Sequence, residues 1–198
     1  PSIFFGGCPV SPLQLPEHVV DIMFEVCSLK LPFQLCSLAM ASGTAPATLA
    51  GTLVVQNAEL LSGIVLTQLI NPGNPFGYGI FTTVMDQRYG TFAAGAPEIG
   101  LLNSATAQLC RSYKIPFMYG TGGATDAKVP DVQAGYEKAM TTLYAALSGV
   151  SAIHDAVSGL LNSVLSVSYE QLIIDNEMCN MVNRILEGIK VNRDTLAV

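Results

Sequence analysis

The chain has 198 residues, of which 50% are hydrophobic and only 12% are charged. Together with a mean hydropathy of +0.44, this composition indicates a packed domain and excludes a disordered chain. A formal net charge of −6 leaves no basic face, which argues against a nucleic-acid partner.

Five short apolar segments alternate with five helical patterns along the chain. We expect strands at 2–7, 31–40, 75–84, 115–120 and 150–157. We expect helices at 15–30, 43–73, 98–114, 129–149 and 162–188. Nearly continuous apolar strands between amphipathic helices predict a parallel sheet covered by helices. Two α/β architectures have this repeat, a doubly wound open sheet and part of a (βα)8 barrel, and the pattern leaves both open.

Cysteine and histidine usage limits the class of site. Five cysteines stand without C-x-x-C spacing, and there are only two histidines. This pattern predicts reduced thiols in the cytoplasm and no metal centre. The long apolar stretch 48–70 is interrupted by Gln56, Asn57 and Glu59, so we expect no membrane span. For Cys8, which follows the first expected strand, we expect a buried and inert thiol.

Functional groups of both architectures gather at the carboxyl ends of the strands. The segment GTGGA at 120–124 follows the fourth expected strand, but it lacks the third glycine of the dinucleotide pattern and the ending of a P-loop. Its glycines fit a tight turn or a close approach of the backbone to a bulky ligand. An anion held at a helix N-terminus, with Lys128 nearby, is a further alternative.

Other candidate residues lie in the segments that follow the strands. Asp86 and Arg88 are two residues apart and fit either an ion pair within the loop or polar recognition of a ligand. Five aromatic residues near strand ends fit core packing individually, or together a frame of rings around a cation: Tyr78, Phe81, Tyr89, Phe92 and Tyr119. His154 fits a hydrogen-bonded structural residue, or a ligand-facing group.

Five segments resemble the trimethylamine methyltransferase family, the MttB superfamily, in the same order along the chain. They are GGCPVSPL, SGTAPATLAGTLVVQNAELLSGIVLTQLINPG, TTVMDQRYGTFAAGAPE, TDAKVPDVQAGYEKAM and SYEQLIIDNEM. The resemblance runs along essentially the whole chain. Family members are longer, so the chain resembles their central-to-C-terminal portion, and we expect 1–198 to be a single-domain fragment with about five βα units.

The resemblance implies an enzyme with a (βα)8 TIM-type barrel. Such an enzyme moves a methyl group from a tertiary or quaternary methylamine to Co(I) of a cognate corrinoid protein. The corrinoid (cobalamin) is then supplied by the partner protein, and no directly bound cofactor or metal is expected on this chain. A non-catalytic truncated barrel that acts as a binding module, and an anion-binding βα protein, are the alternatives. An exposed half-barrel also predicts self-association.

The family resemblance also indicates where the centre of the barrel lies. Archaeal trimethylamine enzymes of the family, which serve methanogenesis, carry pyrrolysine just before a TDAK-like segment, where this sequence has Gly122, Gly123 and Ala124. Either a pyrrolysine is written here as a small residue, or the chain is a family member without pyrrolysine. Members of the latter kind are associated with glycine betaine and related quaternary amines.

Under this interpretation the catalytic centre consists of Gly122, Gly123, Ala124 and His154. Position at strand ends adds a substrate-binding set: Tyr78, Asp86, Arg88 and Tyr119. The two tyrosine rings would face the cation, and the Asp86–Arg88 pair would order its loop or contact a substrate carboxylate. Asp126 and Lys128 would fix the glycine turn by hydrogen bonds.

Overall fold

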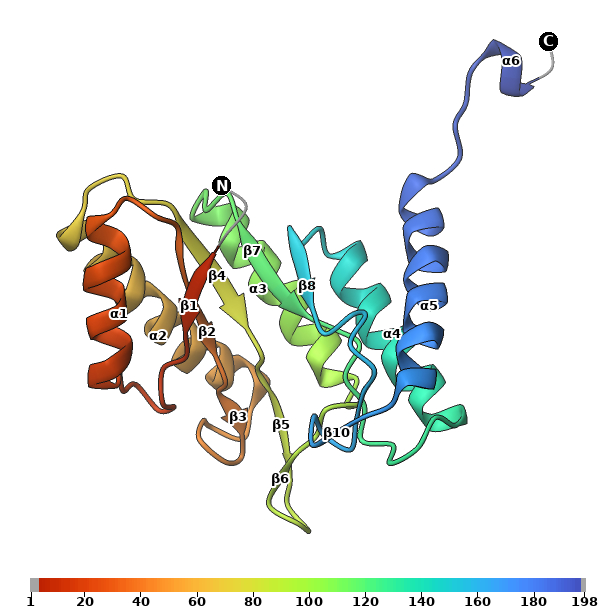
Figure 1. Ribbon diagram of the computed structural model, residues 1–198, viewed down its shortest axis with the longest axis horizontal. Helices are drawn as coiled ribbons and strands as arrows, with labels where there is room; N and C mark the ends of the chain where they lie inside the picture. Colours follow the sequence, from red (N-terminus) through yellow and green to blue (C-terminus); the bar gives the residue numbers. More distant parts are fainter. Residues whose placement is uncertain (1–3, 197–198) are drawn as a thin grey trace.

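A parallel five-stranded sheet, with its strands in chain order, organises the protein (Figure 1). The computed structural model describes residues 4–196. The strands are β1 (Phe5–Gly7), β2 (Phe33–Ser37), β4 (Phe76–Ile80), β7 (Met118–Thr121) and β8 (Ala152–His154). Each strand pairs in parallel with the next. All five expected strands are therefore confirmed, although residues 2 and 3 of the first lie outside the described residues.

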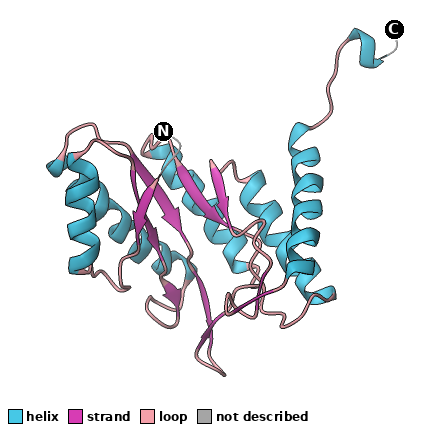
Figure 2. Ribbon diagram, viewed as in Figure 1, coloured by secondary structure: helices cyan, strands magenta, loops and turns pink. Residues whose placement is uncertain are grey.

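Five long helices cover one face of the sheet as a single layer (Figure 2). They are α1 (Glu17–Ser28), α2 (Leu49–Ile70), α3 (Glu98–Ser112), α4 (Val132–Leu147) and α5 (Tyr169–Glu187). A short helix, α6 (Arg193–Leu196), lies apart from the rest near the C-terminus (Figure 1). Consecutive helices contact one another in chain order. A doubly wound sheet reverses its strand order and carries helices on both faces, so that alternative is excluded. The structure is a mixed α/β fold consistent with a partial α/β barrel.

Side chains of the central strands divide between the two faces of the sheet. Phe76, Tyr78 and Ile80 of β4 belong to the hydrophobic core between sheet and helices. Gly77 and Gly79, which alternate with them, lie on the other face, because successive residues of a strand point to opposite sides. We call that uncovered side the inner face of the sheet. One-sided packing therefore leaves the inner face free to form a site.

Short strands lie beyond the carboxyl ends of the main sheet. They are β3 (Met40–Ala41), β5 (Thr83–Asp86) and β6 (Thr91–Phe92), which form one small sheet, and the antiparallel pair β9 (Leu160–Leu161) and β10 (Ser166–Val167). The expected helix start at residue 162 is wrong. Asn162, Ser163 and Val164 have left-handed backbone, which a right-handed helix excludes. The helix begins after Ser168, whose side chain accepts a hydrogen bond from the Gln171 backbone N–H.

Helix α2 carries a buried carboxylate in an otherwise apolar sequence. Glu59 accepts hydrogen bonds from the Ser11 Oγ at 3.0 Å, the Leu13 N–H at 3.0 Å and the Ser37 Oγ at 2.6 Å. It thereby ties the segment after β1 and the end of β2 to the helical layer. By length and composition alone α2 could cross a membrane, but core helices pass the same test. Its contacts with β2, β4, α1 and α3 identify it as part of the helical layer.

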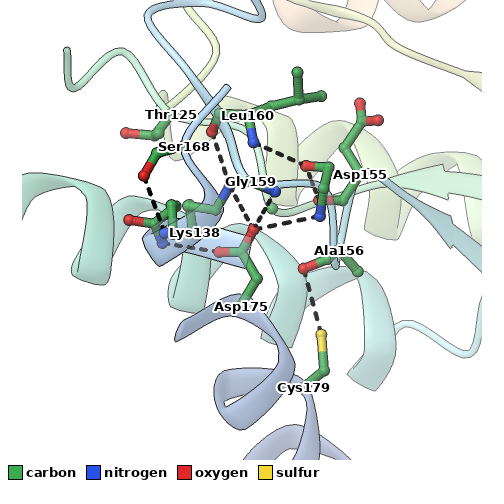
Figure 3. Close-up of polar contacts among 12 residues, drawn as sticks. Thr125, Lys138, Asp155, Ala156, Gly159, Leu160, Ser168, Asp175 and Cys179 are labelled. Carbon is green, nitrogen blue, oxygen red and sulfur yellow. Dashed lines mark hydrogen bonds and ion pairs between the residues drawn. The ribbon is translucent and has the colours of Figure 1, made fainter. Parts of the chain in front are cut away.

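A buried ion pair fixes the segment that follows β8. Lys138 Nζ of α4 lies 3.0 Å from Asp175 Oδ2 of α5, and neither side chain has any exposed area. The ammonium also donates to the Leu160 carbonyl, and Asp175 accepts from the backbone N–H groups of Ser158 and Gly159 (Figure 3). Two helices and the β8–β9 segment are thus joined through one charged cluster.

Removing one partner of this pair will destabilise the fold strongly, since it leaves the other charge buried. We expect Lys138→Ala to lower the free energy of unfolding by about 3–5 kcal/mol. The matched control is Arg184→Ala, because Arg184 pairs with Glu187 at the surface, with side chains 68% and 70% exposed. That change will cost less than about 1 kcal/mol. Urea unfolding of both variants tests the difference, and equal losses would contradict it.

Candidate functional site

A row of aromatic rings crosses the inner face of the sheet. Phe117 stacks on Phe4 at a centroid distance of 4.8 Å and on Tyr119 at 6.1 Å. Tyr119 then meets the His154 ring edge-on at 3.9 Å, and His154 in turn meets Phe81 at 6.4 Å. The row therefore joins the start of β1 to the carboxyl ends of β4 and β8.

A pocket of about 460 Å³ opens beside this row at the carboxyl ends of the strands. Rings and polar groups converge on it, and the chief lining residues are Cys8, Gln34, Cys36, Phe81, His154 and Asp155. We call this cavity the inner pocket. Concave sites at the carboxyl ends of parallel strands are where α/β enzymes bind their ligands.

His154 and Asp155 bring ionisable groups to the inner pocket. The Nε2 atom of His154 is buried and has no hydrogen-bond partner within residues 4–196. Burial lowers the pKa of this imidazole, so the ring is neutral at neutral pH. Burial also raises the pKa of the Asp155 carboxyl, and the nearby Lys138 ammonium opposes that shift. The pocket thus holds an unpartnered polar nitrogen and a carboxyl group in a poorly hydrated place.

The glycine turn after β7 packs against the backbone of the His154–Asp155 segment. The Gly122 N–H donates to the His154 carbonyl at 3.1 Å, and the Gly123 N–H donates to Thr141 Oγ1 at 3.2 Å. A Cβ on Gly123, whose φ is +75°, would lie 2.3 Å from the Asp155 carbonyl oxygen. The sequence left open whether these glycines serve a tight turn or a close approach of the backbone to a bulky ligand. The contacts of Gly123 favour a tight, closely packed turn. Both amides are already bonded, which removes the donors that the anion-binding alternative needs.

Polar contacts of the TDAK segment hold neighbouring loops in place. Asp126 accepts from the backbone N–H groups of Ala94 and Gly95, at 2.9 and 3.1 Å, and from Ser163 Oγ at 2.6 Å. The buried Glu137 carboxylate accepts from the Asp126 N–H at 2.9 Å. Asp126 was expected to fix the glycine turn, but its side chain instead holds the segments at Ala94–Gly95 and Ser163.

A second cavity, of about 730 Å³, adjoins the first; we call it the outer pocket. Its chief lining residues are Asp86, Tyr89, Phe92, Asp126 and Lys128. Phe92 stacks on Phe81 of the inner pocket at 5.0 Å, so the two cavities share an aromatic wall. The candidate site therefore consists of two neighbouring cavities, the inner pocket and the outer pocket.

Comparison with known proteins supplies the family. Residues 8–198 match the family described as Trimethylamine methyltransferase (MTTB). The chain belongs to this family. It is 47% identical to the trimethylamine methyltransferase MttB of Methanosarcina barkeri (strain Fusaro), over 96% of this chain and 38% of that protein. The corresponding protein of Methanosarcina thermophila is 45% identical, over 96% of this chain and 39% of the relative.

A second kind of relative bears on the substrate question. The glycine betaine methyltransferase of Desulfitobacterium hafniense (strain Y51) is 41% identical, over 99% of this chain and 43% of that protein. The chain thus spans about two fifths of the length of the curated relatives that it matches. The resemblance noted in the sequence is confirmed, and the family includes enzymes named for a tertiary and for a quaternary amine.

The four residues predicted to bind substrate do not all lie in one pocket. Tyr119 lies on the inner face, and Asp86 lines the outer pocket. Tyr78 is fully buried on the opposite face, where its hydroxyl donates to Asn57 of α2 at 2.5 Å. The expectation that Tyr78 rims the pocket is therefore corrected, since strand alternation turns it toward the helices. Arg88 is exposed, and the bond within the loop runs from its backbone N–H to Asp86 Oδ1 at 2.8 Å.

Of the four residues in the predicted catalytic set, only His154 lines a pocket described above. His154 lines the inner pocket. Gly122, Gly123 and Ala124 are buried beneath it, and Ala124 is only 1% exposed. Their catalytic role, which came from the family resemblance, stays a prediction. Phe81, one of the aromatic residues expected near the strand ends, lines the pocket, and so does Asp155, which the sequence did not single out as a ligand.

Substitution at Gly123 tests whether glycine is required there by close packing or only by its left-handed backbone conformation. Gly123→Ala meets the Asp155 backbone, so we expect a loss of unfolding free energy well above the roughly 1 kcal/mol that a left-handed backbone alone costs. Gly73→Ala is the matched control, because Gly73 has φ +83° and open space around its Cα. Urea unfolding of both variants is the measurement. Similar losses in the two would show that the turn is not tightly packed.

Asp155→Asn will remove a pH-dependent cost of burial. Since its pKa is raised in the folded protein, the folded state binds more protons than the unfolded state just above the ordinary pKa. Stability therefore falls as pH rises through that window, and the amide removes this fall. Asparagine tolerates the left-handed backbone of residue 155, at φ +61°. Urea unfolding at pH 4 and pH 7 tests the slope, and an unchanged slope in the variant would contradict the assignment.

Proposed function

We propose that the protein is a corrinoid-dependent methyltransferase that transfers a methyl group from a tertiary or quaternary methylamine to Co(I) of a cognate corrinoid protein. Membership of the family and the names of the relatives support this proposal. The observation that carries it to this chain is the inner pocket, which Phe81, His154 and Asp155 line at the carboxyl ends of the strands, with the Tyr119 ring packed edge-on against His154. We further propose that the complete protein closes an eight-stranded barrel and works in the cytoplasm.

The inner pocket suits a methylated ammonium group. Aromatic faces attract such cations by about 0.5–2 kcal/mol each, and the Asp155 carboxylate supplies the opposite charge. His154 is neutral because of its burial, so it does not repel a cation. The row of rings and the carboxyl group therefore orient the donor and keep water from it.

The required chemistry is modest for a quaternary donor. The partner's corrinoid supplies a strongly nucleophilic Co(I), and the departing group is a neutral tertiary amine. This chain then has to position the methyl group and to exclude water, rather than donate a proton. The outer pocket beside Asp86 and Phe92 offers room for the approach of the corrinoid protein. Corrinoid binding is assigned to the partner and to no residue of this chain.

A methyl-transfer assay with the full-length protein tests the function. It combines a reduced corrinoid protein with trimethylamine, glycine betaine, carnitine or choline, and follows cobalt methylation by absorbance. We expect transfer from at least one donor. Transfer from a quaternary amine alone supports a member without pyrrolysine at Gly122–Ala124, and transfer from trimethylamine supports a special residue at that place. Silence with every donor, when a second methyltransferase charges the same corrinoid protein, would overturn the proposal.

Tyr119 variants test whether the inner pocket is the donor site. We expect Tyr119→Leu to raise KM for the donor by about 2- to 30-fold, the equivalent of one lost ring–cation contact. Tyr119→Phe keeps the ring and will retain most of the affinity. Tyr136→Leu is the control, because Tyr136 is 55% exposed on α4 and, unlike Tyr119, does not contact His154 beside the pocket. An unchanged KM in Tyr119→Leu would move the donor site elsewhere.

A further inference from the structure

Two cysteines face each other across the first two strands. Gly6 pairs with Gln34 and Gly7 pairs with Leu35 in the parallel β1–β2 register. Cys8 directly follows β1, and continuation of this register by one residue places it beside Cys36 of β2. Both thiols are free and both line the inner pocket. Sequence spacing had suggested unrelated thiols, so this pairing is a product of the fold.

The geometry of adjacent strands suits a bond between the two sulfurs. Neighbouring strands lie about 4.8 Å apart, and disulfides span Cα separations of about 4.4–6.8 Å. Cys36 is buried in β2, whereas Cys8 is exposed, contrary to the expectation of a buried thiol. Glu59 holds the following segment through Ser11 and Leu13, so the position of Cys8 is fixed by a buried anchor.

The electrostatic environment gives the two thiols different reactivity. The hydrogen bond from the Cys36 thiol lowers the pKa of Cys8 to about 7. The same bond, burial and the nearby charges of Cys8 and Asp155 raise the pKa of Cys36. The Cys8 thiol therefore ionises more readily than an ordinary cysteine, while Cys36 keeps its proton. Such an asymmetric pair has one attacking thiol and one resolving thiol.

From this arrangement we infer that Cys8 and Cys36 form a redox-active dithiol, which low-molecular-weight disulfides convert into an intrachain disulfide. The Cys8 thiolate attacks one sulfur of the small disulfide, which forms a mixed disulfide and releases one small thiolate. Cys36 then loses its proton, attacks Cys8 Sγ and displaces the second small thiol. Two protein thiols are oxidised and one small disulfide is reduced, so electrons and atoms balance without another oxidant. An excess of small thiol reverses the reaction.

Exposure of the intact, fully reduced protein to glutathione disulfide tests the inference. The readouts are the intact mass and a peptide map of these cysteines under acid-quenched conditions. We expect the wild-type protein to lose two hydrogen atoms and to yield a linked peptide that contains Cys8 and Cys36. Accumulation of a glutathione adduct on Cys8, with Cys36 still reduced, would overturn the inference.

Three variants make the assignment specific. Cys36→Ser will stop at one glutathione on Cys8, because the resolving thiol is missing. Cys8→Ser will slow the oxidation of Cys36 at least about tenfold, because the remaining thiol is protonated. Cys179→Ser is the matched control: it removes a half-buried thiol, bonded to the Ala156 carbonyl at 3.4 Å, and will still form the Cys8–Cys36 link. Oxidation of Cys8→Ser at the wild-type rate would refute the attacking role of Cys8.

A folding defect has to be separated from a loss of reactivity. Cys36 is buried, so Cys36→Ala serves as a second variant that introduces no buried hydroxyl. Circular dichroism before oxidation selects the folded variants. A folded Cys36→Ala protein that still forms a disulfide at Cys8 with another cysteine of this chain would contradict the pairing.

Discussion

One-sided burial of the parallel sheet is the constraint on which the site depends. Phe76, Tyr78 and Ile80 fill the core toward the helices, while Gly77 and Gly79 alternate with them on the inner face. The strands are parallel, so their carboxyl ends lie at the same edge of the sheet. The helices form one layer, so one face of the sheet stays uncovered. The site therefore forms where the strand ends and the uncovered face meet. A sheet with helices on both faces would have no such inner face.

Buried and half-buried carboxylates hold the segments at that end of the sheet. Glu59 fixes the segment after β1, Asp126 fixes the loop before α3, and Asp175 fixes the segment after β8. Each accepts backbone N–H groups that would otherwise be buried without partners, which offsets the cost of burying the charge. Glu137 does the same for the turn at Asp126. Irregular backbone at the site is thus held by carboxylate side chains, three from the helical layer and Asp126 from a loop, rather than by regular hydrogen-bonded ladders.

Sequence patterns predicted the repeat of strands and helices well, because apolar periodicity reports burial directly. They predicted side-chain direction poorly. Tyr78 and Tyr119 were both expected at the pocket, yet a shift of one residue in strand phase sends a side chain to the opposite face. The Cys8–Cys36 pairing was beyond reach for a related reason, since register between strands is a property of the assembled sheet. The false helix start at 162 arose because left-handed backbone at non-glycine residues leaves no clear sequence signal.

The glycine turn shows how a family motif and a physical constraint can meet in one segment. Gly122 and Gly123 are both closely packed: a Cβ on Gly122 would lie 2.9 Å from the Thr142 Cα of α4, and a Cβ on Gly123 would lie 2.3 Å from the Asp155 carbonyl oxygen. A larger residue at Ala124 would have to leave this buried position or displace its neighbours. Ala124 is 1% exposed, so the observed packing fits a small residue at that position.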